Sequence, residues 1–207
     1  MKLSELFARC TDIKYTKLDA GVDVAVENSN GTLYIFFQDS DGRQDWKTNL
    51  DFPAEFYPLA GVYAHRGFLR SWKIAEGYLS HTISSSSGSI VCAGYSLGGA
   101  LALLCHGYIW HKKPELRHFC TGFGFGAPRV LWGHKNEKTE RIWQSFTVVR
   151  NLDDAITHLP PSVLGYFHAG KVLEIGNSGA YGAFEAHKSD NILAELKKYE
   201  ENTVTPT

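Results

Sequence analysis

The chain has 207 residues, of which 43% are hydrophobic and 13% aromatic, and its 21 basic and 22 acidic side chains nearly cancel. This length predicts one domain over residues 1–207 with a sizeable core. The balanced charge, without long runs of one sign, argues against an electrostatic grip on nucleic acid or on an anionic membrane. The expected partner is therefore a small or neutral molecule.

Cysteine usage and the N-terminal sequence bear on the compartment. The 4 cysteines form no CxxC pair, and they are too sparse for a disulfide framework. The N-terminal residues hold no continuous apolar segment of the length that secretion requires, and no apolar run approaches the roughly 20 residues of a membrane-spanning helix. These features predict a cytoplasmic protein without a membrane span.

In chain order, the first predicted elements are two strands and a helix. Residues 22–27 alternate strictly between apolar and polar, which is typical of an edge or antiparallel strand. Residues 32–37 form a continuous aromatic and β-branched run, which suits a strand buried on both faces. A helix is expected from residue 62 to about residue 80. Its apolar residues at helical spacing are Phe68, Trp72, Ala75 and Leu79.

The second half of the chain alternates short strands with helices. A buried strand at 90–93 precedes a helix at 97–111 that is apolar nearly all round and should lie inside the molecule. Further strands are expected at 119–125 and 146–149, and further helices at 137–144 and 191–199. This alternation predicts an α/β fold, with a mostly parallel central sheet flanked by helices.

The motif that carries chemistry is Gly94-Tyr95-Ser96-Leu97-Gly98, which fits the pattern G-x-S-x-G between the buried strand and the apolar helix. In that context the serine stands at the tip of a sharp strand-to-helix turn. Glycines suit the two flanking positions because larger side chains would collide with the adjoining strand and helix. The helix also points its unpaired N–H groups, that of Leu97 first, at a substrate oxygen beside Ser96. Ser96 is therefore the predicted nucleophile, rather than an incidental cap in a glycine-rich turn.

A serine hydroxyl needs a base and a carboxylate that orients this base, in the chain order Ser, Asp or Glu, His. Asp153 and Asp154 follow the last predicted strand, where functional groups of an open α/β sheet collect, and spacing leaves both candidates open. Of the 9 histidines, His187 lies on a loop before the last helix and is the predicted base. His158 lies too close to the two acids, and the segment around His168 favours a structural role.

Taken together, these segments resemble the fungal-type triacylglycerol lipases (class 3 lipases) from about Thr32 to about Leu196. The resemblance rests on VCAGYSLGGALALL at the serine, GFGAPRV after it, RNLDDAITHLPP at the acids and AHKSDN at the late histidine. In that family the acid stands six positions before the first proline, which selects Asp154, and the last segment supports His187. The resemblance implies a single α/β-hydrolase domain with a triad of Ser96, His187 and Asp154.

The same resemblance covers an earlier segment. FFQDSDGRQDWKTNLDF is similar to the family's oxyanion stretch and lid, and HRGFLRSW to its H-x-G-F segment. It implies an oxyanion hole made by Ser40 and Leu97, with Trp46 and Tyr95 assigned to substrate binding. Trp46 is the one aromatic residue among mainly polar neighbours at 41–49, so a short polar lid and weak interfacial activation are expected.

The predicted function is that of a serine carboxylic-ester hydrolase, a lipase or esterase. It would cleave acylglycerols or short-to-medium-chain esters through an acyl-enzyme, with no cofactor and no metal, and would touch a lipid interface only transiently. The alternatives are a phospholipase A1-type lipid esterase and a degenerate hydrolase that serves as a binding protein. The second alternative is favoured by Gln38-Asp39-Ser40, which stands where the family usually has Arg-Gly-Thr.

Overall fold

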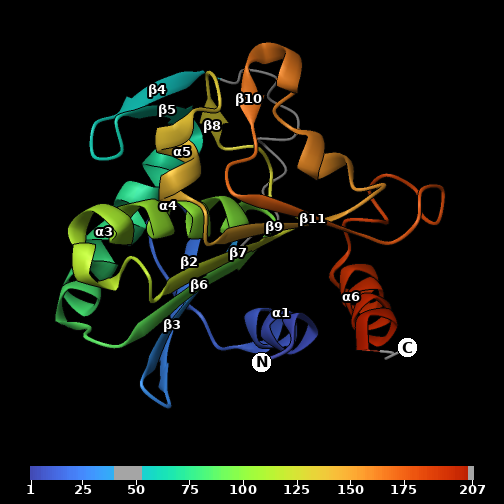
Figure 1. Cartoon of the computed structure of the whole chain (residues 1–207), viewed down its shortest axis with the longest axis horizontal. Helices are drawn as coiled ribbons and strands as arrows, with labels where there is room; N and C mark the ends of the chain where they lie inside the picture. Colours follow the sequence, from blue (N-terminus) through green and yellow to red (C-terminus); the bar gives the residue numbers. More distant parts are fainter. Residues whose placement is uncertain (40–52, 205–207) are drawn as a thin grey trace.

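The computed structural model describes residues 1–39 and 53–204, and a seven-stranded sheet forms its centre (Figure 1). From one edge to the other, its strands are β1 (Thr16–Lys17), β2 (Val22–Ser29), β3 (Thr32–Asp39), β6 (Ser89–Tyr95), β7 (Cys120–Phe125), β9 (Phe146–Asn151) and β11 (Lys171–Ile175). The strands from β3 to β11 are parallel to their neighbours, and β1, β2 and β3 pair antiparallel. The predicted α/β-hydrolase fold with a mostly parallel sheet is confirmed.

Helices cover both faces of this sheet (Figure 1). On one face lie α3 (Arg66–Ser85) and α4 (Leu97–Lys112), and on the other α1 (Leu3–Asp12) and α6 (Ser189–Val204). The alternation along β3 shows why both faces are apolar: Ile35 and Phe37 pack with α3 and α4, whereas Phe36 packs with α1 and α6. Each face therefore has its own apolar cluster.

Helix α4 lies in the interior, as its apolar sequence predicts. Every residue from Gly98 to Trp110 is buried, because the helix is enclosed by the sheet on one side and by α3 on another. A nearly all-apolar helix has no face that prefers water, so it is stable only in such a position. Its first turn, next to Ser96, is consequently held by packing on several sides.

A second, smaller sheet of antiparallel strands lies next to these helices (Figure 1). Its strands, in order, are β10 (Tyr166–Phe167), β8 (Leu131–Trp132), β5 (Val62–His65) and β4 (Ala54–Tyr57). The expected helix from residue 62 is wrong over its first four residues, which form β5. The His65 N–H donates to the carbonyl of Val130, so pairing with a distant strand overrides the helical pattern there. From Arg66 the helix forms, and its four predicted apolar residues are buried.

The remaining elements are short or differ slightly from the expected bounds. Helix α5 (Glu137–Ile142) ends two residues before the expected end, and α6 extends beyond its expected bounds at both ends. Single 3-10 turns lie at Asp19–Gly21, Pro114–Leu116, Ala155–His158 and Ser162–Leu164. Within the described ranges, no helix is long and apolar enough to cross a membrane.

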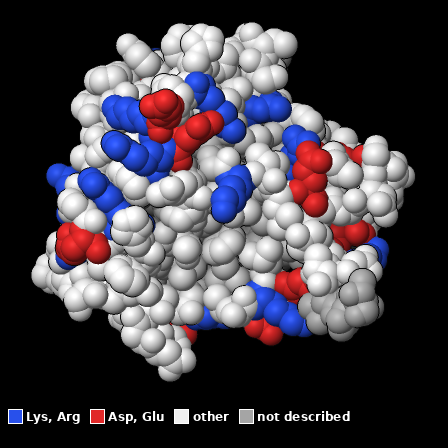
Figure 2. All heavy atoms as spheres, viewed as in Figure 1, with Lys and Arg blue, Asp and Glu red and all other residues white. Residues whose placement is uncertain are grey.

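Charge is distributed as the composition suggests. On the face shown in Figure 2, basic and acidic side chains are interspersed, with broad uncharged areas between them. Several of the ion pairs are local surface contacts, such as that of Lys73 with Glu55 at 3.3 Å and that of Lys188 with Glu185 at 2.8 Å. Such exposed pairs contribute little to stability.

Candidate active site

The turn at Ser96 has the backbone of a nucleophile elbow. Strand β6 ends at Tyr95, helix α4 begins at Leu97, and Ser96 between them has φ 56° and ψ −122°. A residue with a side chain in this region carries a strain of roughly 1–3 kcal/mol, which the surrounding structure must offset. The Ser96 N–H donates to the Phe125 carbonyl at 2.9 Å, so the neighbouring strand β7 helps to hold the turn.

The glycines on each side of Ser96 are required by close backbone contacts. A Cβ at Gly94 would lie 2.1 Å from the carbonyl oxygen of Gly98, and a Cβ at Gly98 would lie 2.1 Å from that of Phe37. Real Cβ atoms do not approach backbone oxygens this closely. The collisions expected from the sequence are therefore present, and the first turn of α4 sits directly against the end of β3.

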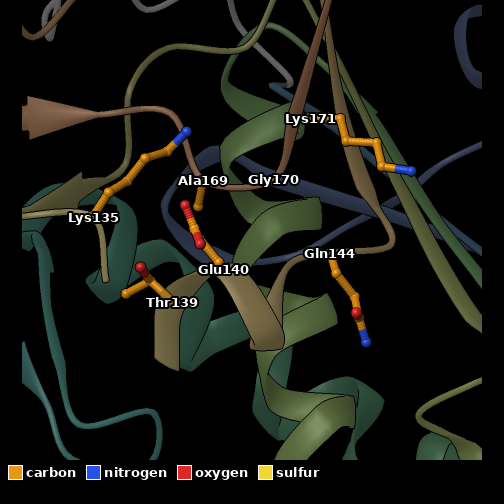
Figure 3. A pocket seen from close by; sticks show the side chains of 7 residues that line it. All are labelled: Lys135, Thr139, Glu140, Gln144, Ala169, Gly170 and Lys171. Atoms are coloured by element: carbon orange, nitrogen blue, oxygen red, sulfur yellow. The ribbon is translucent and has the colours of Figure 1, made fainter. Parts of the chain in front are cut away.

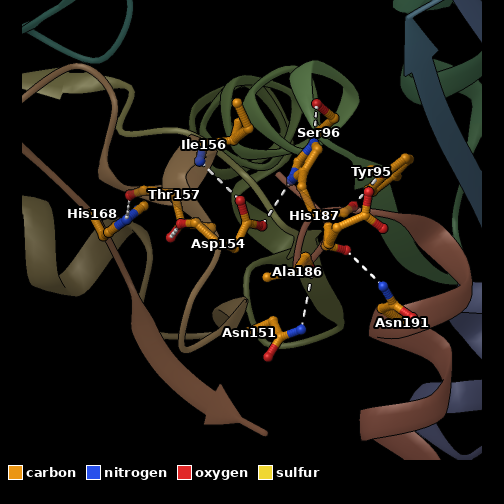
Figure 4. A network of polar contacts seen from close by, with 11 residues as sticks. Tyr95, Ser96, Asn151, Asp154, Ile156, Thr157, His168, Ala186, His187 and Asn191 are labelled. Atoms are coloured by element: carbon orange, nitrogen blue, oxygen red, sulfur yellow. Dashed lines mark hydrogen bonds and ion pairs between the residues drawn. The ribbon is translucent and has the colours of Figure 1, made fainter. Parts of the chain in front are cut away.

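Three side chains from distant parts of the chain meet at this turn (Figure 4). The His187 Nε2 lies 2.9 Å from Ser96 Oγ, and the His187 Nδ1 lies 2.8 Å from Asp154 Oδ2. Asp154 follows β9, and His187 precedes α6. The structure thus brings together the three residues that the sequence proposed as a triad.

Asp154 is fully buried, and both of its carboxylate oxygens have partners. Oδ2 faces His187, and Oδ1 accepts the backbone N–H of Ile156 at 2.9 Å. Because a carboxylate is primarily an acceptor of hydrogen bonds, this contact favours the tautomer of His187 with its proton on Nδ1. The Nε2 lone pair is then free to accept the hydroxyl proton of Ser96, which is the arrangement a general base needs.

The neighbouring Asp153 has a different role. Its carboxylate accepts the backbone N–H groups of Gly179 at 3.1 Å and Tyr181 at 3.3 Å. These bonds, that of Gly179 first, hold the pKa of Asp153 below its usual value. Asp153 therefore ties its own loop to residues 176–188, the segment between β11 and α6 that we call the histidine loop, whereas Asp154 faces the imidazole.

The two other histidines weighed from the sequence lie outside the contacts that join Ser96, His187 and Asp154. His168 is buried with Nε2 2.8 Å from the Thr157 carbonyl oxygen, and burial lowers its pKa to about 4. It is therefore neutral at pH 7 and structural, as expected. His158 lies on the 3-10 turn after Asp154, where burial also lowers its pKa.

Tyr95 is placed differently from its assignment to substrate binding. Its hydroxyl donates to the backbone carbonyl of His187 at 2.5 Å, and its ring stacks on the imidazole with centroids 5.1 Å apart. Phe7 of helix α1 packs against the Tyr95 ring, with centroids 5.7 Å apart. Both the polar and the apolar parts of Tyr95 are thus engaged inside the protein. The structure does not place this side chain as a substrate contact.

Sequence reasoning also missed Asn151, the last residue of β9. This residue is buried, and its amide Nδ2 donates to the carbonyl oxygen of Ala186 at 3.0 Å, directly before His187 in the chain. A buried amide at the end of an apolar strand was a usable indication, because such a group needs a specific hydrogen-bond partner.

The predicted oxyanion hole is described on one side only. Leu97 is the first residue of α4, so its N–H has no acceptor within the helix, and it lies at the positive end of the helix dipole. Ser40, Trp46 and the expected lid at 41–49 lie outside the described residues.

A cavity of about 250 Å³ lies between α5 and the loop before β11 (Figure 3). Its lining includes Lys135, Glu140 and Lys171, and none of the three residues around Ser96. In the described parts of the chain, no three His, Cys, Asp or Glu side chains are grouped so that they could hold a metal ion.

Comparison with known proteins gives consistent matches. The model of the lipase (class 3) family matches residues 34–164. A lipase of Rhizomucor miehei is 30% identical over 160 residues, which cover 74% of this chain and 44% of the relative. The secreted mono- and diacylglycerol lipase 1 of Fusarium solani is 30% identical over 167 residues, covering 74% of this chain and 46% of the relative. The structure of the Rhizomucor miehei triacylglyceride lipase aligns with a TM-score of 0.68 and 26% identity, over 80% of this chain and 68% of that one.

The relatives correct one expectation. The predicted cytoplasmic location is wrong, since the Fusarium solani relative is by its name a secreted protein. The chain spans less than half the length of these two curated relatives.

The family match covers well over half of the chain, and it includes the elbow, the loop of the two acids and the cis-proline segment after it. The sheet order, the strained serine and the relatives agree with this match. The chain therefore belongs to the fungal-type class 3 lipase family of the α/β-hydrolase superfamily.

Proposed function

We propose that this protein is a serine carboxylic-ester hydrolase that acts on lipid esters. The observation that carries the proposal is the line of contacts from Ser96 Oγ through His187 to Asp154, at 2.9 and 2.8 Å, on a strained strand-to-helix turn. Its relatives are named as lipases, one of them for mono- and diacylglycerols. Acylglycerols and short-to-medium-chain esters are accordingly the proposed substrates.

In the proposed reaction, His187 Nε2 takes the hydroxyl proton as Ser96 Oγ attacks the ester carbonyl carbon. The imidazolium then protonates the departing alkoxide, so that an alcohol leaves and an acyl-enzyme remains. Water enters, gives a proton to the same nitrogen and attacks the acyl carbon. The carboxylic acid leaves, and Ser96 regains its proton.

Asp154 would keep the imidazole in the tautomer that accepts at Nε2, and it would stabilise the positive charge that forms in each half-reaction. Its complete burial supports this role, because a charge pair interacts more strongly where water is excluded. The Ile156 N–H holds the other carboxylate oxygen at 2.9 Å, which limits rotation of the acid.

The negative charge that develops on the substrate oxygen would be received by the N–H of Leu97 at the start of α4, with Ser40 as the proposed second donor. One such donor contributes about 3–4 kcal/mol to transition-state stabilisation. The intact contacts of Ser96 support an enzyme over the alternative of a degenerate binding protein. No feature of the described residues favours a phospholipase.

The test is Ser96→Ala. We expect hydrolysis of p-nitrophenyl butyrate to fall by at least about 10⁴-fold in kcat, because the nucleophile is lost. The thermal unfolding midpoint should stay within about 2 °C of the parent value, since alanine fits the same space. Ser80→Ala, on the exposed side of α3, is the matched control and should keep full activity. Retained activity in Ser96→Ala, or failure of a fluorophosphonate probe to label the parent protein at Ser96, would contradict the proposal.

A further inference from the structure

The histidine loop contains no helix or strand, yet it has to place an imidazole accurately. Three consecutive backbone carbonyls in it, those of Glu185, Ala186 and His187, each accept a hydrogen bond from a side chain (Figure 4). The donors are Asn191 Nδ2 at 2.7 Å, Asn151 Nδ2 at 3.0 Å and the Tyr95 hydroxyl at 2.5 Å. They come from α6, β9 and β6, so three separate elements hold one short stretch of backbone.

Tyr95 makes two of the contacts to His187. The hydroxyl binds the carbonyl oxygen, and the aromatic ring lies against the imidazole at an interplanar angle of 26°. Burial, and then the carboxylates of Asp154 and Asp190, raise the pKa of Tyr95, so the hydroxyl stays protonated and remains a donor. Because Tyr95 directly precedes Ser96, the residue that ends the nucleophile's strand also holds the base.

Asn151 occupies a buried position at the end of a strand, which would suit an apolar side chain. It is buried, and among the described residues its Oδ1 has no hydrogen-bond partner. Gly176 leaves the space for this oxygen, since a Cβ there would lie 2.4 Å from it. A buried amide with one unpaired end destabilises the fold. The bond from Nδ2 to the Ala186 carbonyl is the contact through which Asn151 can act on the histidine loop.

We propose that Tyr95 and Asn151 are positioning residues that hold the backbone on both sides of the Cα of His187, and thereby set the distance from Nε2 to Ser96 Oγ. The inference rests on the proposed function of this triad. Asp154 fixes the imidazole at one nitrogen, but it does not fix the backbone from which the ring projects. A displacement of about 1 Å at a reacting group lowers a rate by about 100-fold. Asn191 is more exposed and acts one residue further away, so it is not included.

The main test compares Tyr95→Phe with Tyr15→Phe. Tyr15 is a matched control because its hydroxyl also donates to a backbone carbonyl, that of Cys10, at 2.5 Å, and none of its described contacts is with Ser96, Asp154 or His187. We expect Tyr95→Phe to lower kcat for p-nitrophenyl butyrate by about 10- to 100-fold with KM changed less than about twofold. The rate of fluorophosphonate labelling of Ser96 should fall in parallel. Both variants should lose a similar amount of thermal stability, because each loses one hydrogen bond to a backbone carbonyl. Tyr15→Phe should nevertheless keep kcat and the labelling rate within about twofold of the parent values.

Asn151→Leu provides a second, independent variant. Leucine has a similar branched shape, removes the unpaired Oδ1 and leaves the Ala186 carbonyl without its donor, so a purely structural role predicts a change in thermal stability alone, with unchanged activity. The proposal predicts the same change in stability together with a kcat lowered by about 10-fold and a matching loss of labelling rate.

The outcomes separate the two proposals. Parent-like kcat and labelling in both Tyr95→Phe and Asn151→Leu, with Ser96→Ala inactive, would overturn the positioning role and leave the proposed function in place. Activity in Ser96→Ala would overturn the function itself. Lower kcat in Tyr15→Phe, equal to that in Tyr95→Phe, would assign the effect to general stability and would also overturn the positioning role.

Discussion

The turn that carries Ser96 and the loop that carries His187 meet at a 2.9 Å contact but are built in opposite ways. The turn is made by consecutive residues: a buried strand, two glycines and the first turn of an apolar helix. The loop has no regular structure and is held from outside, by Tyr95 at a sequence separation of 92, by Asn151 at 35 and by Asp153 at 26. The proposed nucleophile is thus positioned by local backbone geometry, whereas the proposed base is held by distant side chains.

The two adjacent aspartates show the same contrast within one loop. Asp153 accepts backbone N–H groups from the histidine loop and so fixes where the loop lies. Asp154 accepts from the imidazole and so fixes how the ring is oriented. Placement of the loop and orientation of the ring are therefore separable, and substitutions can break one without the other.

The largest effect is expected from Asp154→Asn. Asparagine keeps the shape of the side chain but presents a neutral amide to Nδ1, so the imidazole loses its orientation and its counter-charge. We expect kcat for a soluble ester to fall by about 10⁴-fold with little change in KM. Asp153→Asn is the control, and it should cost less than about 10-fold, since it weakens only the attachment of the loop. A larger loss in Asp153→Asn than in Asp154→Asn would reverse the assignment of the acid.

The next largest effect tests the turn itself. Gly98→Ala places a Cβ 2.1 Å from the Phe37 carbonyl oxygen, so either β3 or α4 has to move. We expect the free energy of unfolding in urea to fall by about 3 kcal/mol or more. Gly77→Ala is the control within helix α3, where a Cβ meets nothing within 4 Å, and it should gain about 0.5–1 kcal/mol. Equal stability of the two variants would show that the turn is not close-packed.

The third effect depends on pH and compares a histidine on the helix behind Ser96 with one beside the loop of the two acids. Burial lowers the pKa of His106, on the helix behind Ser96, and of His168, beside the acid loop, to about 4 in each case. In the unfolded chain these histidines bind protons as the pH falls below their ordinary pKa of 6.5. In the folded chain they bind protons only when the pH approaches 4. The contribution of each buried, neutral histidine to the free energy of unfolding is therefore fully present above pH 6.5. It is lost as the pH falls toward 4, by up to about 3 kcal/mol for each histidine.

The measurement is the free energy of unfolding in urea at several pH values between 7 and 4. His106→Gln and His168→Gln should each remove part of the pH dependence of the free energy of unfolding. The free energy of unfolding at pH 7 can differ between the two variants, so only the pH dependence is compared. A parent slope that survives unchanged in either variant would mean that this histidine titrates normally in the folded protein.

Some elements were predictable because their information is local. Helix α4 follows from a run of apolar residues after Gly98, and β3 from an aromatic and β-branched run. The first turn expected for α3 was wrong, because residues 62–65 pair with β4 directly before them, and two of them also pair with β8, more than 60 positions later in the chain. Strands of two residues, such as β8 and β10, have no pattern of their own and exist only through pairing.

The contacts of Tyr95 could be predicted from the sequence only in part. Alternate residues of β6 face opposite sides of the sheet, so Tyr95 shares the α1 and α6 face with Ala93 and not the side of α4. Strand periodicity already argues against a substrate contact of Tyr95. Periodicity does not predict its hydrogen-bond partner, because the His187 carbonyl belongs to a loop far along the chain.

The sequence by itself indicated the class of the protein, the proposed nucleophile and the short set of candidates for acid and base. Strand, glycine and helix patterns involve only a few residues each, so these features depend on residues that are neighbours in the sequence. Spacing left both aspartates open and the family resemblance selected Asp154, whereas only the tertiary structure decided where Tyr95 and Asn151 point and how an irregular loop holds His187. Those features depend on hydrogen bonds between residues 26 to 92 positions apart, which no local sequence pattern encodes.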